Sequence, residues 1–199
     1  MGYTTDFSGS FQLSRPATVQ EKNYLDKLAE TRRMKRDVEK LHELYKGEHG
    51  NPFAKTREEI YGNEGEYFVG AGGSFGQDNK CKSIIDFNEA PGALDRNLFR
   101  DFNEYWEKSQ QHKKDGKCQP GLWLQWVLNE DGTQLEWDGN EKFYSYVEWL
   151  KYLINHFFEP WGIKLNGEVE WQGEESSDIG KIVVTDNKVQ VLAGRVVYE

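Results

Sequence analysis

The sequence predicts an α+β fold in a single domain, 1–199, with a mostly antiparallel sheet and helices packed on one face. Two observations carry this prediction. Several segments alternate between apolar and polar residues with a period of two, which is typical of strands that bury one face. Other segments repeat apolar residues at helical spacing. They stand between the strands without regular β-α-β alternation, which favours α+β over a parallel α/β fold.

The first expected element is a strand at residues 3–13, YTTDFSGSFQL, in which apolar and polar residues alternate. Its apolar side consists of Tyr3, Thr5, Phe7, Phe11 and Leu13. Gly9 in the middle of this strand suggests a bulge or a close approach by another element. Pro16 ends the strand.

A helix is expected from about residue 18 into the forties, because Thr18 and Glu21 have the spacing of a capping box. A basic cluster interrupts its apolar stripe, so we expect a break or a bend there. The cluster consists of Arg32, Arg33, Lys35 and Arg36. We interpret it as a solvated helix face, with a contact to an anion or to nucleic acid as the alternative.

The middle of the chain has weaker signals. Residues 46–65 are rich in Gly, Asn and charge and are expected to form a loop with a short helical turn at 56–61. Short strands are expected at Tyr67–Val69 and Ser83–Phe87, on either side of the glycine run GAGGSFG. A second helix is expected between residues 95 and 112, where aromatic residues fall at helical spacing.

The stretch from residue 121 to residue 158 gives the clearest signals in the chain. Residues 122–128 and 133–138 are expected to form two strands around a turn that contains glycine, and an apolar helix is expected at 141–158. This order indicates a hairpin with a helix on one of its faces. Further strands are expected at 163–172, 180–185 and 188–193, the last two joined through Asp186 and Asn187.

The charge is placed unevenly along the chain. Residues 121–199 contain 14 Asp+Glu and 6 Lys+Arg, a net charge of −8, out of −9 for the whole chain. Such an acidic part argues against direct nucleic-acid binding there, because phosphate contacts need Lys and Arg. It favours a basic partner, or it serves solubility alone.

The remaining composition points to a cytoplasmic protein without metal or membrane contact. No apolar run approaches the roughly 20 residues that span a bilayer, and the N-terminus lacks the pattern of a signal peptide. Cys81 and Cys118 are expected to be free thiols. Their spacing to His112 matches no zinc pattern, so we expect no metal.

Catalytic and cofactor motifs give no convincing match. Gly72–Gly76, GGSFG, matches the nucleophile turn of α/β-hydrolases, but the residues after it predict no helix and the chain lacks parallel-sheet order. A flexible glycine loop is the better interpretation. Phosphate-binding and calcium-binding loops also fail at their required positions. We therefore expect no catalytic residue and no cofactor.

The candidate site is a face of the sheet rather than a motif. Alternation in the strands places a set of polar and aromatic side chains opposite the face that the 141–158 helix would cover. The set is Trp123, Gln125, Glu136, Asp138, Glu168 and Glu170. Neighbouring carboxylates can bind a cation or a basic group, or share a proton in catalysis, and they can equally be ordinary outward residues. A large aromatic residue among charges favours a binding surface.

Four segments carry a resemblance to other sequences: EGEYFVGAGG, IIDFNEAPG, PGLWLQWVLNEDGTQLEWDGNEKFY and NGEVEWQGE. They resemble segments of a group of uncharacterised proteins of bacteria and their phages, for which no activity is established. The resemblance implies a bacterial or phage cytoplasmic context. It also implies that residues 35–60 and 95–117 are polar and helical insertions into a shorter core.

The leading functional hypothesis is a non-catalytic, acidic protein that binds another macromolecule. A phage-encoded inhibitor or adaptor acting on a host protein would fit the charge, with the partner's surface basic. The alternative is a small-molecule-binding protein or a hydrolase that uses the acidic and Trp cluster. A third hypothesis is an oligomerising subunit that makes contact through the aromatic residues of the 95–106 helix.

Overall fold

The computed structural model describes residues 2–70 and 89–196 of the chain. These residues have an α+β fold, which confirms the predicted class. Six strands form one sheet in the order β2-β3-β1-β4-β5-β6, and every neighbouring pair is antiparallel. The strands are β1 (Thr5–Leu13), β2 (Trp126–Leu128), β3 (Gln134–Trp137), β4 (Leu165–Gly173), β5 (Ile179–Thr185) and β6 (Lys188–Ala193).

Within this fold the chain divides into two compact units, which we describe separately. Unit 1 comprises Met1–Lys22 and Gln125–Glu199 and contains the sheet, and unit 2 comprises Asn23–Leu124. The segments 35–60 and 95–117 both fall in unit 2. That they are insertions stays a prediction.

The predicted N-terminal strand is confirmed as β1, which pairs with β4 along its whole length. Gly9 provides the close approach that its position suggests. It has φ +104°, and a Cβ atom there would come within 2.5 Å of the carbonyl oxygen of Glu168. Gly167 on β4 has φ +139° and approaches the carbonyl oxygen of Ser10 in the same way. Only glycine tolerates both the backbone conformation and the contact, so these two positions set how closely the central strands pair.

The two predicted hairpins form, one of them with a shorter first strand. β2 begins at Trp126 and not at residue 122, because Leu122 belongs to unit 2, where its carbonyl accepts a hydrogen bond from the backbone N–H of Arg33 (2.8 Å). The β5–β6 hairpin turns through Asp186 (φ 48°) and Asn187 (φ 69°). Two successive positive φ values are typical of a type I′ turn, whose twist matches that of the strands.

The apolar helix of unit 1 is shorter than the expected 141–158. It consists of α5 (Tyr146–Leu153) and a π-helical turn, η3 (Ile154–Phe158). Lys142 and Ser145 have φ values of 64° and 54°, which are left-handed and prevent the helix from starting earlier.

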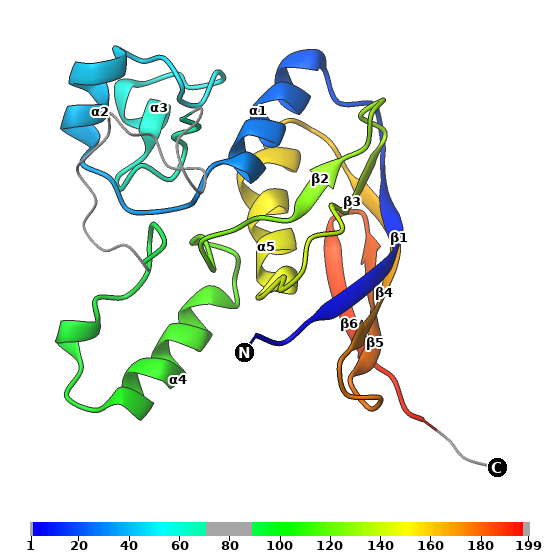
Figure 1. The fold of residues 1–199 in the computed structure, drawn as a ribbon. Helices are drawn as coiled ribbons and strands as arrows, with labels where there is room; N and C mark the ends of the chain where they lie inside the picture. Colours follow the sequence, from blue (N-terminus) through cyan, green and yellow to red (C-terminus); the bar gives the residue numbers. More distant parts are fainter. Residues whose placement is uncertain (1, 71–88, 197–199) are drawn as a thin grey trace. The chain divides into compact units, whose positions relative to one another are not determined.

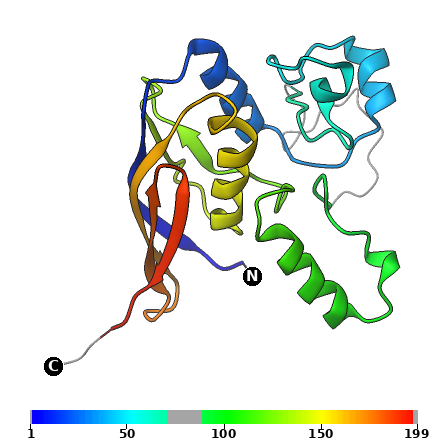
Figure 2. The same cartoon turned by 180° about the vertical axis from the view of Figure 1, so that it is seen from behind.

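The helix α5 covers one face of the unit 1 sheet, which we call the inner face (Figures 1 and 2). The ring centroid of Phe7 on β1 lies 4.8 Å from that of Tyr146, and the indole N–H of Trp126 donates to the Tyr146 carbonyl (2.8 Å). Burial raises the pKa of Tyr146 to about 12. The core on this face contains Phe11, Leu13, Trp126, Leu135, Phe143, Trp149, Leu150, Phe157, Phe158, Val169 and Ile182.

Unit 2 is built from short helices and loops. Its elements are α1 (Val19–Glu30, which begins in unit 1), α2 (Val38–Tyr45), α3 (Arg57–Tyr61), the 3₁₀ turn η2 (Arg96–Leu98) and α4 (Phe102–Lys113). The predicted capping box of α1 is present, since Glu21 accepts from the Thr18 N–H (2.7 Å) and Thr18 accepts from the Glu21 N–H (3.2 Å). The expected break after α1 and the helical turn at α3 are also confirmed.

The basic cluster after α1 is buried, and our interpretation of it as a solvated helix face was wrong. Arg33, Lys35 and Arg36 lie outside any helix and expose 6% of their surface or less. Arg33 donates to the carbonyls of Phe68 (2.7 Å) and Glu66 (2.7 Å) and to the side chain of Gln119 (3.1 Å). A guanidinium bonded in this way can be buried, because each of its three nitrogens donates to an acceptor.

The other two buried cations have the same role. Arg36 donates to the carbonyls of Met34 and Arg32, and its guanidinium lies 4.8 Å from the centre of the Phe68 ring. Lys35 forms ion pairs with the carboxylates of Glu64 and Glu89, both at 3.4 Å. The cluster therefore holds together the loops of unit 2, which have few backbone ladders of their own.

Two further expectations in unit 2 have different outcomes. Tyr67–Val69 does not form a strand, while Ser83–Phe87 and the GGSFG sequence at Gly72–Gly76 lie outside the described residues. The second helix forms as α4, preceded by η2. Leu98 of η2 and Phe102 and Trp106 of α4 are exposed. Oligomerisation through them stays a prediction.

Candidate functional site

The face of the unit 1 sheet opposite α5, the outer face, carries half of the six candidate residues. Phe7 and Trp171 are paired across β1 and β4 and point to the inner face. Because side chains alternate along a strand, their neighbours Ser8 and Glu170 point outward. The same register assigns to the outer face Asp6, Ser8, Ser10, Glu136, Glu168, Glu170, Gln172, Ile179 and Lys181.

Glu168 and Glu170 lie on β4 at the centre of the outer face, and both are exposed. The ammonium group of Lys181 on β5 is 3.2 Å from both carboxylate oxygens of Glu168 and 4.0 Å from the nearer oxygen of Glu170. One lysine therefore serves two carboxylates and is closer to Glu168. Glu170 keeps more of its charge available to a ligand, since the attraction between two charges falls with distance.

Glu136 and Asp138 differ in how far they are engaged by the protein. Glu136 is half-buried on β3, beside Val127 of β2, and its carboxylate forms no hydrogen bond or ion pair with another residue of the described part. Asp138 follows β3 and closes a turn, where its carboxylate accepts from the N–H and the side-chain amide of Asn140, both at 2.8 Å. Asp138 thus has a structural role in this turn.

Gln125 does not lie on an exposed face, which corrects its expected placement. It is buried, and its amide bridges two parts of unit 1. The amide nitrogen donates to the Glu141 carbonyl (3.1 Å), and the amide oxygen accepts from the indole N–H of Trp137 (3.1 Å). Strict alternation in 122–128 predicted that it points outward, but the strand begins only at Trp126, so Gln125 precedes it.

Trp123 belongs to unit 2 and is not a member of the sheet. Its side chain is 37% exposed, and the guanidinium of Arg32 lies 5.8 Å from the centre of its ring. This distance is within the range of a cation–π contact. Of the six candidates, the outer face of unit 1 contains Glu136, Glu168 and Glu170 on its strands.

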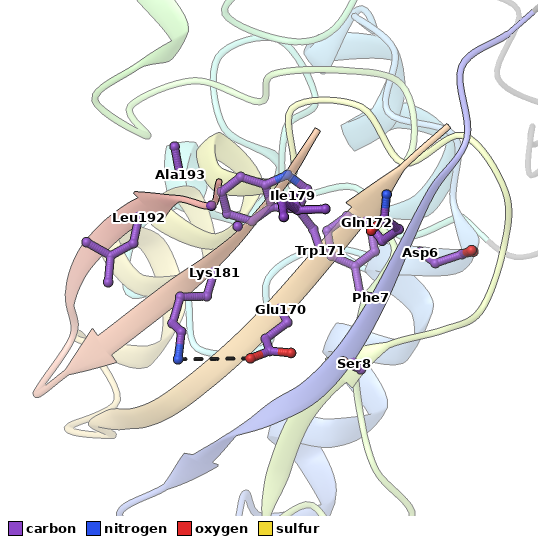
Figure 3. Close-up of a pocket in the computed structure, with 12 residues that line it drawn as sticks. Asp6, Phe7, Ser8, Glu170, Trp171, Gln172, Ile179, Lys181, Leu192 and Ala193 are labelled. Carbon is purple, nitrogen blue, oxygen red and sulfur yellow. Dashed lines mark ion pairs between the residues drawn. The ribbon is translucent and has the colours of Figure 1, made fainter. Parts of the chain in front are cut away.

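A hollow of about 500 Å³ lies on the sheet around Glu170, as Figure 3 shows. Three cross-strand rows line it, and the pairing defines them. The two outward rows are Ser8, Glu170, Lys181 and Leu192, and Asp6, Gln172, Ile179 and Gly194. The middle row consists of Phe7, Trp171, Gly180 and Ala193, which contribute to the floor.

The hollow has a polar and an apolar half. The polar half lies over β1 and β4 and carries the carboxylates of Asp6 and Glu170. The apolar half lies over β5 and β6 and carries Ile179 and Leu192, with Lys181 of β5 at its border with the polar half. Figure 3 shows the side chains of Glu170 and Lys181 extending toward each other across the two strands. Such a site suits a group that combines an aliphatic stem with a positive charge.

Sequence reasoning missed most of this lining. Asp6 and Ser8 are on the polar side of the expected N-terminal strand, so the alternation predicts that they point outward. Their proximity to Glu170, Ile179 and Leu192 depends on the order and register of four strands, for which the sequence has no local signal.

Comparison of the chain with protein-family models finds no match, and the comparisons with curated proteins and with solved structures find none either. None of the helices in residues 2–70 and 89–196 is long and apolar enough to cross a membrane. In the same residues, no three His, Cys, Asp or Glu side chains are grouped so that they could hold a metal ion.

Proposed function

We propose that the protein binds a protein partner through the outer face of unit 1, without catalysing a reaction. The observation that carries the proposal is the exposure of Asp6, Glu168 and Glu170 on adjacent strands, where Lys181 is the neighbouring cation. A surface of this kind attracts a basic partner over a long range and accelerates its association. An inhibitor or adaptor that acts on a host protein would work in this way.

The hollow supports the proposal because it gives the face a point of specific contact. A lysine or arginine of the partner can lay its aliphatic stem against Ile179 and Leu192 and direct its charge to Glu170. Contacts of this kind in a partly enclosed pocket contribute more to affinity than charges at the rim of an interface.

The test is affinity capture from bacterial lysate with charge-reversed variants. The double variant Glu168→Lys with Glu170→Lys replaces two carboxylates of the outer face with positive charges. Because the face then no longer attracts positive charge, we expect this variant to capture no basic partners. The matched control is Glu130→Lys with Glu159→Lys, which changes the net charge equally at exposed positions off this face. Equal capture by both double variants would refute the proposal.

A second candidate function, binding of a small amphiphilic cation, is favoured by the size of the hollow. Its volume of about 500 Å³ is within the range of ligand pockets. Matched six-carbon probes distinguish the charge requirement: hexylammonium, hexanol and hexanoate. We expect hexylammonium alone to shift the methyl resonances of Ile179 and Leu192 in NMR spectra. Equal shifts with all three probes, or no shift, would exclude this function.

A further inference from the structure

The last strand of the sheet, β6, presents an unpaired edge. In the described residues β6 pairs with β5, and it stands at one end of the strand order. Five of its six residues are exposed, among them Val191 and Leu192, which are 48% and 41% exposed. An exposed apolar edge is a template for another strand.

The register of the β5–β6 pair identifies which backbone groups are free to accept a new strand. The N–H of Gly194 donates to the carbonyl of Ile179 (2.8 Å), so this pair is a hydrogen-bonded one. Hydrogen-bonded and non-hydrogen-bonded pairs alternate in an antiparallel ladder. The groups that point away from β5 are therefore those of Val189, Val191 and Ala193.

The edge lacks most of the features that block pairing in natural sheets. Residues 188–193, KVQVLA, contain no proline, and the register with β5 is continuous without a bulge. Val189 and Val191 point to one face and Leu192 to the other, so an added strand would meet apolar side chains on both faces. The one charged residue in β6, Lys188, lies at its beginning.

The charges at the ends of this edge indicate which strand would fit. Lys188 and Arg195 are both exposed, and the segment between them has no acidic residue. An antiparallel second copy centred on the same segment would place Lys188 opposite Arg195, which is a like-charge pair. A segment with an apolar middle and carboxylates at its ends would instead be complementary to the edge.

We propose that β6 is a docking edge for an extended segment of a partner protein, apolar in its middle and acidic at both ends. This segment adds to the sheet as a further antiparallel strand. Hydrogen bonds from the backbones of Val189, Val191 and Ala193 give affinity, and the flanking cations Lys188 and Arg195 set the register. The inference concerns the edge of the sheet and is independent of the acidic outer face.

Amide hydrogen exchange followed by NMR tests the backbone contacts directly in the wild-type chain. The probe is a short peptide of alternating valine and threonine between two terminal glutamates, with a lysine-ended version as control. We expect the glutamate-ended peptide to slow exchange of the Val189, Val191 and Ala193 amides. The amides of Gln190 and Leu192, already bonded to β5, should change little. Unchanged exchange of the three outward amides at saturating peptide would overturn the proposal.

A proline variant separates the backbone from the side chain. Val191→Pro removes an outward N–H and leaves the bonds to β5 in place, and proline is tolerated on an edge strand. Val191→Thr keeps the N–H and is the control. We expect peptide binding to weaken at least tenfold in Val191→Pro and to persist in Val191→Thr. Equal weakening in both would contradict backbone pairing, and concentration-dependent dimerisation of the wild-type chain that Val191→Pro abolishes would assign the edge to a second copy.

The proposals for the outer face and for the β6 edge can be disproved independently of each other. Glu168→Lys with Glu170→Lys leaves β6 unchanged, so this variant should still protect the three amides when the peptide binds. Val191→Pro leaves the carboxylates in place, so capture of basic partners should persist in it.

Discussion

Trp171 lies across Gly180, its cross-strand neighbour on the inner face of unit 1. A Cβ atom on Gly180 would collide with Cη2 and Cζ2 of the indole ring. The ring is fixed in this position by a hydrogen bond from its N–H to the carboxylate of Asp178 (3.0 Å). This contact supports the floor of the hollow, because both residues belong to its middle row.

Gly180→Ala should therefore destabilise the protein by about 1–3 kcal/mol, the usual cost of overpacking a filled site. Urea unfolding followed by circular dichroism gives the free energy of unfolding. In a Trp171→Leu background the ring is absent, so the added methyl group should cost less. Part of the cost should remain, because the carbonyl oxygen of Leu192 also lies 2.5 Å from the position of that methyl group. An equal cost in both backgrounds would show that the backbone, and not the ring, requires glycine at this position.

Arg33 should be among the most sensitive residues of unit 2. Its guanidinium is fully buried and donates to three acceptors. Arg33→Met removes this donor from the Phe68 carbonyl and from the Gln119 side chain, while the Glu66 carbonyl keeps its bond from the Gln119 amide (2.7 Å), and we expect a cost of about 3–5 kcal/mol. Arg33→Lys should rescue little, since an ammonium group cannot match the planar geometry of the fork.

The matched control for Arg33 is Arg100→Lys, a change at an exposed arginine of the same unit that should stay within about 0.5 kcal/mol. Thermal unfolding monitored by tryptophan fluorescence compares the variants. If Arg33→Lys behaved like Arg100→Lys, the buried cluster would not be what holds the loops of unit 2.

The strands and most helices could be predicted because the spacing of apolar and polar residues within each segment follows which side chains are buried. β1 and β4 alternate in apolarity since one side of each packs on α5, and the capping residues of α1 lie three positions apart. The burial of Arg33 could not be predicted, because its acceptors at Phe68, Glu66 and Gln119 are distant in sequence. A run of basic residues resembles a solvated surface until those carbonyls are known.

The candidate site was predicted only in part for a related reason. Alternation predicted the outward direction of Glu168 and Glu170, and their exposure agrees. It gave no information on the strand order that places Lys181 beside them, or on where β2 begins. Because β2 begins after Gln125, this residue is not an exposed binding residue but a buried one whose amide bridges Glu141 and Trp137.

The start of α1 should contribute a pH-dependent part of the stability. Hydrogen bonds from Arg15 hold the pKa of the Glu21 carboxyl below its usual value of 4.5. A carboxyl with a lowered folded pKa contributes stability above its unfolded value. That contribution is lost as the pH falls through the folded value.

Glu21→Gln should therefore lower the free energy of unfolding at neutral pH and flatten its decline below about pH 4.5. Urea titrations at a series of pH values measure both effects. Glu130→Gln, at an exposed carboxylate in the β2–β3 turn, is the control and should leave the curve unchanged. An identical acid slope in Glu21→Gln and the wild type would contradict this assignment.

Gln125 provides a test that separates structural from binding roles among the candidate residues. Gln125→Leu removes the bridge between the Trp137 indole and the Glu141 carbonyl in a buried position. The carbonyl loses that donor while the indole keeps its contact to Asn140 (3.2 Å), so we expect a loss of about 1–3 kcal/mol in stability. Below the unfolding temperature the outer face stays intact, because Glu168 and Glu170 are on another strand. Capture of basic partners by Gln125→Leu should therefore match the wild type, whereas a loss as large as that of the Glu168→Lys and Glu170→Lys variant would return Gln125 to the binding surface.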